Sequence, residues 1–175
     1  MAKTALIVNE MQNDYLWEKR KDKFPYDTAA LLDAVNAAID RVQAAGGDVL
    51  YISQIFPDTP SNHIIFGYGI TGTEGAKLHA GLHIVSAHCF EKNVSDLFAD
   101  AKFREFITAQ GYDELLFCGI DECACIAATA KAAAAAGIRA VILSKSTATR
   151  FDTRKKGATR ADLKAVGVIY QEEPL

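Results

Sequence analysis

Three side chains of different chemistry follow apolar segments of the sequence. Glu10 follows residues 4–8 with only Asn9 between them, and Cys125 lies just beyond residues 114–118. Lys92 follows a third apolar segment. A carboxylate, an ammonium and a thiol can together form a nucleophilic site, because the carboxylate takes the proton from sulfur and the ammonium favours the anionic forms of both. These residues are the candidates for a nucleophilic centre that needs no histidine.

Cys125 stands in the first turn of the helix expected over residues 124–136. A helix N-terminus offers free N-H groups and a partial positive charge, which favour a thiolate, and N-H groups before the cysteine would hold a substrate oxyanion. The alternative is that Cys125 is a small buried apolar residue, which is how we interpret Cys118 inside its strand. Cys123 and Cys125 form C-x-C, so the spacing supports neither a thioredoxin-like motif nor a zinc knuckle.

Glu10 and Lys92 each have an ordinary alternative as well. Glu10 could cap or solvate a loop, and a lone lysine is most often a solvated surface charge. The evidence for a site is their joint placement with Cys125.

The elements that must position these residues alternate between strand and helix. Apolar runs predict six strands, at residues 4–8, 48–53, 83–87, 114–118, 139–144 and 168–171. Helical patterns are expected over residues 28–44, in a short turn at 74–79, in a helix through 109, and over 124–136 and 161–166. This order predicts an α/β fold with a mainly parallel six-stranded sheet between two helical layers. Ligands of such sheets bind beyond the carboxyl ends of the strands, where all three candidate residues would lie.

Two long loops, residues 9–26 and 54–72, would line the pocket. Their candidate pocket residues are Tyr15, Trp17, Phe24, His63, Phe66 and Tyr68. The aromatic members could instead pack the loops onto the body or form a subunit contact. Residue types alone do not define a substrate.

The composition is that of an ordinary globular chain. It has 175 residues, of which 50% are hydrophobic and 23% charged, and a net charge of -3. We therefore expect one domain over residues 1–175, with a charge that does not favour nucleic-acid binding. Charge by itself identifies no partner, and the expectation of a small-molecule substrate and no membrane partner rests on the candidate site and the apolar pattern. Four cysteines are too few for a secreted disulfide scaffold, and the apolar run at the N-terminus is too short for a signal peptide or a membrane span. The expected location is the cytoplasm.

Four segments resemble one known family, the isochorismatase-like cysteine hydrolases, which include nicotinamidases and N-carbamoylsarcosine amidases. ALIVNEMQNDYL resembles the family's opening A-L-x-V-x-D-M-Q-N-D-F, and GIDECACIAATAKAA resembles its G-V-x-T-D-x-C-V-x-x-T-A-x-D-A. Between them, GTEGAKL is similar to G-T-x-G-A-x-L, and FEKNVSDLF is similar to K-x-x-x-S-A-F. The resemblance spans nearly the whole chain.

The resemblance implies a three-layer αβα Rossmann-like fold, a homo-oligomer and a triad. By position, Cys125 would be the nucleophile, Lys92 its electrostatic partner and Glu10 the base. The family also has a cis peptide before the cysteine, here between Ile120 and Asp121. That turn would aim the N-H groups of Asp121 and Cys125 at the oxyanion.

The chain departs from the family at several positions. Glu10 replaces an aspartate, and this extra methylene could misplace the base by about 1 Å and lower the rate on the order of a hundredfold. Asn9 replaces an apolar residue, Glu122 and Cys123 replace T-D, and Lys145 replaces a late aspartate.

Nicotinamidases of the family hold a metal through a D-x-H then H pattern. This chain retains only His63 of that pattern, and Gln54, Ile55 and Phe56 stand at its first part. Because a stable site needs three or four ligands, we expect no metal and no cofactor.

Three hypotheses follow. The first is a metal-independent cysteine hydrolase that cleaves a C-N bond of a small amide or ureide through a thioester. The second is isochorismatase-type hydrolysis of a vinyl ether, in which the cysteine would be dispensable. The third is a catalytically weakened protein that keeps the scaffold for binding a small molecule or for oligomer formation.

Overall fold

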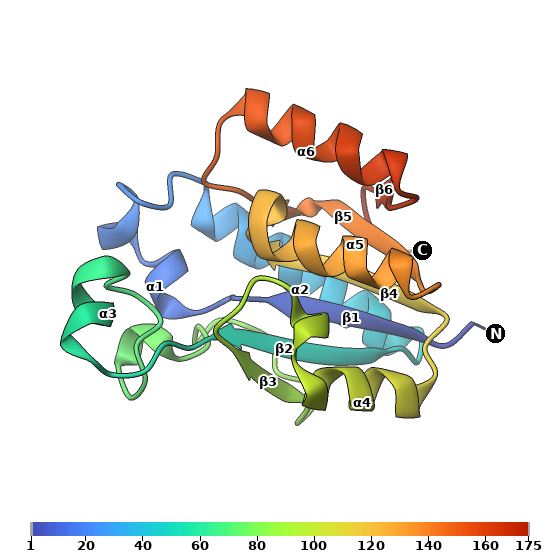
Figure 1. The fold of residues 1–175 in the computed structure, drawn as a ribbon, viewed down its shortest axis with the longest axis horizontal. Helices are drawn as coiled ribbons and strands as arrows, with labels where there is room; N and C mark the ends of the chain where they lie inside the picture. Colours follow the sequence, from blue (N-terminus) through green and yellow to red (C-terminus); the bar gives the residue numbers. More distant parts are fainter. Residues whose placement is uncertain (1, 175) are drawn as a thin grey trace.

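The computed structural model describes residues 2–174, which form a six-stranded sheet with helices on both faces (Figure 1). All strand pairs are parallel, in the order β3-β2-β1-β4-β5-β6. The strands are β1 (Thr4–Asn9), β2 (Asp48–Gln54), β3 (Cys89–Lys92), β4 (Glu114–Ile120), β5 (Arg139–Ala148) and β6 (Ile169–Gln171). The predicted α/β class is confirmed.

One long helix covers one face of the sheet and three cover the other (Figure 1). The helices are α1 (Asn13–Leu16), α2 (Thr28–Ala44), α3 (Pro60–Ile65), α4 (Ala101–Gln110), α5 (Ala127–Ala135) and α6 (Thr153–Ala165). Helix α2 packs on the first face, and α4, α5 and α6 pack on the second. Within residues 2–174, no helix combines the length and the apolar character needed to cross a membrane.

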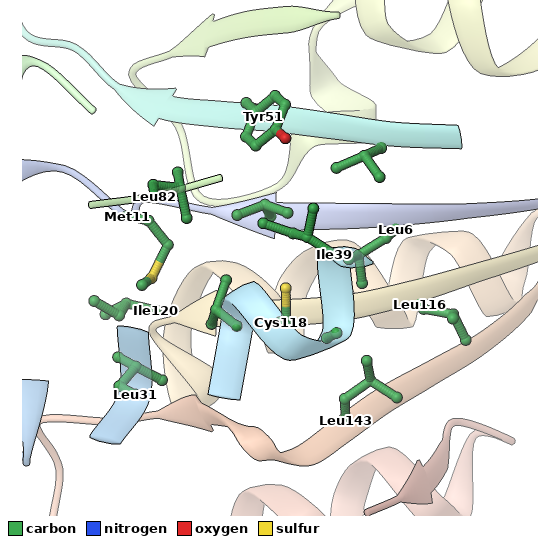
Figure 2. Packing of buried hydrophobic residues seen from close by; sticks show 14 of the residues in the cluster. Leu6, Met11, Leu31, Ile39, Tyr51, Leu82, Leu116, Cys118, Ile120 and Leu143 are labelled. Atoms are coloured by element: carbon green, nitrogen blue, oxygen red, sulfur yellow. The ribbon is translucent and has the colours of Figure 1, made fainter. Parts of the chain in front are cut away.

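The core on the α2 side contains Cys118. Its sulfur lies among apolar side chains that include Ile39 of α2 and Leu116 of β4 (Figure 2). The residue is 0% exposed, and burial raises its pKa far above the usual thiol range. Cys118 therefore acts as a small apolar core residue.

The core on the other face depends on small residues in α5. Ala130 and Ala133 are completely buried and lie in the same cluster as Phe103 of α4 and Leu163 of α6. Because alanine favours helix and adds little bulk, the backbone of α5 can approach the sheet closely. The alanine-rich segment is thus packed structure.

The third strand is shifted from its predicted position at residues 83–87. That segment runs beside β2 without strand pairing, because the Tyr51 side chain takes up hydrogen-bonding groups of its backbone. The Tyr51 hydroxyl donates to the His83 carbonyl at 2.7 Å and accepts from Val85 N at 3.0 Å. Strand pairing starts only where Tyr51 lies opposite Cys89. Lys92 is consequently the last residue of β3, in register with Gln54 of β2.

Two helix boundaries also differ from prediction. Helix α6 begins at Thr153, because Asp152 caps it by accepting from Lys155 N at 2.8 Å, whereas the sequence pattern identified residues 161–166 as part of a helix and left its start undefined. The segment around Cys125 is a π-helical turn, Glu122–Ile126, that leads into α5. Such turns occur frequently at functional sites.

Gly119 lets β4 and β1 approach closely beside the site. Its φ is +95°, and a Cβ atom there would lie 2.1 Å from the Asn9 carbonyl oxygen. Only glycine avoids both the strained conformation and the clash. The position sets Ile120 and the following turn against the end of β1.

Candidate active site

Glu10 and Lys92 form a buried ion pair at the carboxyl end of the sheet. Glu10 Oε1 lies 2.7 Å from Lys92 Nζ, and their side chains are 5% and 0% exposed. Glu10 has a φ of +53°, an uncommon conformation for a residue other than glycine. The extra methylene of the glutamate therefore does not prevent contact with the lysine.

Gln54 holds Lys92 in place. Its Oε1 accepts from Lys92 Nζ at 2.8 Å, and its Nε2 donates to the Lys92 carbonyl at 3.2 Å. Lys92 Nζ also donates to the Val94 carbonyl at 3.1 Å. Burial is the largest single influence and disfavours the ammonium charge, but the charges of Glu10 and Cys125 and the hydrogen bonds to both together outweigh it and raise the pKa of Lys92. The lysine is therefore charged at neutral pH.

Cys125 lies at the base of the same cavity, on the π-helical turn. Asp121 caps this turn through Oδ1, which accepts from Cys123 N at 2.9 Å, and the Ile120-Asp121 peptide bond is cis. Cys125 is 9% exposed. The cis geometry agrees with what the family resemblance implied for this turn.

The electrostatic state of Cys125 differs from the sequence-based expectation. Burial raises the pKa of its thiol to about 12, the charge of Glu10 also raises it, and Lys92 acts in the opposite direction. The helix N-terminus therefore does not produce a resting thiolate, because desolvation and a neighbouring carboxylate outweigh it. The thiol carries its proton at neutral pH until a base removes it.

A second buried carboxylate, Glu122, anchors the cysteine turn to α6. Glu122 is 0% exposed and accepts from Arg160 Nε at 2.6 Å and from Arg160 Nη2 at 3.1 Å. Thr147 Oγ1 donates to it at 3.3 Å, and Lys156 Nζ lies 3.7 Å away. Glu122, at a position where the chain departs from the family pattern, therefore links β5 and α6 to the turn that carries Cys125.

We expect Arg160→Gln to lower the free energy of unfolding by about 2 kcal/mol, because it leaves a buried carboxylate short of a partner. The value lies below that of a fully buried pair, since the Arg160 side chain is 32% exposed and Lys156 remains. Urea unfolding of the wild type and the variant measures the change.

The matched control is Arg154→Gln, an exposed arginine on the same helix. The double variant Glu122→Gln, Arg160→Gln should be less destabilised than the sum of the two single variants, because neither residue then leaves an unpaired charge. Equal stability of Arg160→Gln and wild type, within roughly 0.5 kcal/mol, would contradict the anchoring role.

The cavity above Cys125 has a volume of about 260 Å³. Four of the predicted pocket residues line it, namely Tyr15, Phe24, Phe66 and Tyr68. Their rings form one aromatic cluster, extended by Phe56, which stacks on Phe66 with ring centroids 3.9 Å apart. One wall of the cavity is therefore aromatic.

Two predicted pocket residues, Trp17 and His63, do not line this cavity. The Trp17 ring lies under Lys19 Nζ, 3.9 Å from its centroid, and Trp17 is half-buried. His63 Nε2 pairs with Asp58 Oδ1 at 2.7 Å, and the His63 side chain is 51% exposed. Both side chains find partners at the surface, which residue type alone does not reveal.

The sequence did not single out Gln54 and Arg150 as site residues, yet both line the cavity. Like Glu10, both lie where a parallel strand ends at the carboxyl edge of the sheet. Gln54 is the last residue of β2, and Arg150 comes two residues after β5. Asn93 to Ser95, just after β3, complete the lining on that side. The polar residues at or just after the strand ends were the sequence signal that could have identified Gln54 and Arg150 as cavity residues.

The Q-N-D segment after Glu10 holds the two loops together. Gln12 Nε2 donates to the carbonyls of Gln54 and Ala76 at 3.0 and 2.7 Å. Asp14 accepts from Gly69 N at 2.9 Å and pairs with Arg20 at 2.8 Å. These bonds explain the motif physically: consecutive polar side chains satisfy loop backbone groups and so shape the aromatic wall.

The residues at the position of the nicotinamidase metal do not fit a metal ion. Both polar atoms of the Gln54 side chain bind Lys92, and His63 is engaged with Asp58. Within residues 2–174, no group of three or more His, Cys, Asp or Glu side chains is arranged to hold a metal. We derive no catalytic step through a metal.

Two other departures from the family pattern lie outside the cavity lining. Asn9 is 0% exposed at the end of β1, beside Gly119. Lys145 lies where β5 shifts its register against β4, and it pairs at the surface with Glu172 at 2.7 Å. Neither change removes a group from the cavity.

Sequence comparison decides the family. A model of the isochorismatase domain matches residues 4–173. The chain belongs to the isochorismatase family. This family is hydrolytic, and the membership confirms the resemblance on which the residue assignments were based. No protein with a curated description matches the chain by sequence.

Solved structures of this isochorismatase family share the fold. The chain superposes on an isochorismatase family protein from Desulfovibrio vulgaris with a TM-score of 0.83 and 21% identity, over 97% of this chain and 94% of that one. N-carbamoylsarcosine amidase from Thermoplasma acidophilum gives 0.80 and 20%, over 99% and 98%. A nicotinamidase from Bacillus subtilis gives 0.83 and 21%, over 97% and 99%. At these identities the likeness establishes the fold.

Proposed function

We propose that this isochorismatase family member is a metal-independent cysteine hydrolase that cleaves the C-N bond of a small amide or ureide. The supporting observation is that Glu10 and the Cys125 thiol line one cavity, and that Lys92, buried and paired with Glu10, lies close enough for the pKa of the thiol to respond to both charges. The nicotinamidase and N-carbamoylsarcosine amidase among the structural neighbours act on bonds of this class.

In the proposed mechanism Glu10 takes the proton from the Cys125 sulfur as the sulfur attacks the substrate carbonyl carbon. The N-H groups of Asp121 and Cys125 hold the resulting oxyanion, and the ion pair with Lys92 holds the Glu10 carboxylate in position. Glu10 then returns the proton to the nitrogen, the C-N bond breaks, and ammonia or an amine leaves. Water, deprotonated by Glu10, hydrolyses the thioester and restores the thiol.

The raised pKa of Cys125 is compatible with this order of events. Because the resting thiol is protonated, the site needs a base in contact range, and Glu10 is the carboxylate that raises this pKa. The cavity of about 260 Å³ is small by comparison with typical ligand pockets, which favours a compact substrate.

Ammonia release from a panel of small primary amides and ureides tests the proposal. We expect turnover of at least one compound, and an acid quench during turnover should trap an acylated protein whose added mass maps to Cys125. Turnover that persists after Cys125 has been fully alkylated would contradict the thioester mechanism.

The two competing functions give different results in the same experiment. A vinyl ether hydrolase would release no ammonia and would keep its activity after alkylation of Cys125. A weakened binding protein would turn over nothing, although a small molecule would still raise its melting temperature. We also propose a cytoplasmic homo-oligomer, whose subunit number light scattering would measure.

A further inference from the structure

Tyr15 brings a hydroxyl group into the aromatic wall of the cavity. The residue belongs to α1, is 3% exposed and lines the cavity. Its ring packs edge-on against Phe24 and Tyr68, with centroid distances of 5.0 and 5.5 Å, and these contacts restrict the position of the hydroxyl. The opening motif of the family has phenylalanine here, so the hydroxyl is an addition of this chain.

The Tyr15 hydroxyl has no hydrogen-bond partner within residues 2–174, although a buried tyrosine hydroxyl usually has one. Three other tyrosine hydroxyls donate to a carbonyl or a carboxylate, namely those of Tyr26, Tyr51 and Tyr112. The Tyr170 hydroxyl is sealed inside the described part of the protein without a partner, whereas the Tyr15 hydroxyl is not sealed. It therefore opens onto the cavity that its ring lines.

The same hydroxyl lies close to the reacting groups. Burial raises the pKa of Tyr15 well above its usual range, and the nearby Glu10, Tyr68 and Cys125 groups raise it further. The hydroxyl therefore keeps its proton at neutral pH and can donate a hydrogen bond. A molecule bound at Cys125 lies within its reach.

The proposed mechanism indicates which part of the substrate meets this donor. The carbonyl oxygen faces the N-H groups of Asp121 and Cys125, and the scissile nitrogen takes its proton from Glu10. The remaining substituent of the carbonyl carbon is thus the part that lies against the aromatic wall. A purely apolar substituent would cover the Tyr15 hydroxyl without offering it an acceptor, which is unfavourable.

We propose that Tyr15 determines specificity by donating a hydrogen bond to the substrate, and that the substrate is a small amide or ureide with an oxygen acceptor close to its scissile group. The inference rests on the proposed C-N hydrolysis and specifies its substrate class.

Methoxyacetamide and butanamide test the hydrogen bond, because they differ only in an ether oxygen against a methylene group. Their dissociation constants are measured by NMR titration of the Cys125→Ala protein, with and without Tyr15→Phe. We expect Tyr15→Phe to weaken methoxyacetamide binding roughly 3- to 10-fold, as the loss of a neutral hydrogen bond allows. Butanamide binding should stay unchanged or become tighter, because no hydroxyl is then left without a partner. Methoxypropanamide and pentanamide repeat the comparison with the oxygen further from the carbonyl.

The matched control is Tyr112→Phe, which removes a tyrosine hydroxyl just before β4, at the opposite edge of the sheet, and should change none of the affinities. Equal changes for ether and hydrocarbon in Tyr15→Phe at both chain lengths, or binding of none of the four amides, would overturn the proposal. The wild-type protein is assayed in parallel for ammonia release from the same compounds. An ether preference that depends on Tyr15 without turnover would reject the hydrolysis and keep the hydrogen bond, and turnover without this preference would do the reverse.

Discussion

Replacement of Cys125 by alanine is expected to lower kcat for amide or ureide hydrolysis on the order of 10⁵-fold, because the thioester can no longer form. The fold should be retained, since the side chain is small and its removal exposes no buried charge. Steady-state ammonia release and the melting temperature of the same preparation measure the two effects.

Cys123→Ala is the matched control for this loss. Cys123 lies on the same turn, and its contribution to the turn is a backbone N-H bond to Asp121 that alanine keeps. We expect it to retain activity close to that of the wild type. Activity that survives Cys125→Ala on a vinyl ether substrate would instead support the isochorismatase-type reaction and reject the cysteine mechanism.

Glu10→Gln is expected to change turnover and thiol reactivity in opposite directions. Turnover should fall on the order of 10³-fold, because no group then accepts the thiol proton during attack. Glu10 raises the pKa of Cys125 through its charge and its hydrogen bond, whereas Lys92 lowers it. Without the carboxylate the thiol pKa should fall, so more thiolate is present at pH 7. Alkylation by iodoacetamide should then become faster, by about tenfold if the pKa falls by one.

The pH profile of alkylation checks the sign of this effect. In the wild type the rate should keep rising well above pH 9, because the thiol loses its proton only near its raised pKa of about 12. In Glu10→Gln the rise should begin at lower pH. Cys89 is exposed and would react as well, so the measurement is made in a Cys89→Ser background. Slower alkylation in Glu10→Gln, or unchanged turnover, would contradict the assigned role of Glu10.

Much of the fold could be predicted from local patterns. Apolar runs and helical periodicity predicted the order of strands and helices, since burial of both sheet faces demands continuous apolar strands. The same patterns misplaced the third strand, where Tyr51 and not a ladder satisfies residues 83–87. They located only part of α6, whose first turns carry mostly exposed charged side chains.

The sequence by itself determined which groups would meet: because parallel strands end at one edge, Glu10, Lys92 and Cys125 had to approach one another there. The tertiary structure decided how they interact. The 2.7 Å ion pair and the raised pKa of Cys125 depend on contacts between distant segments and on desolvation. None of these is a property of residue type or spacing, because burial and electric fields arise only when the chain has folded.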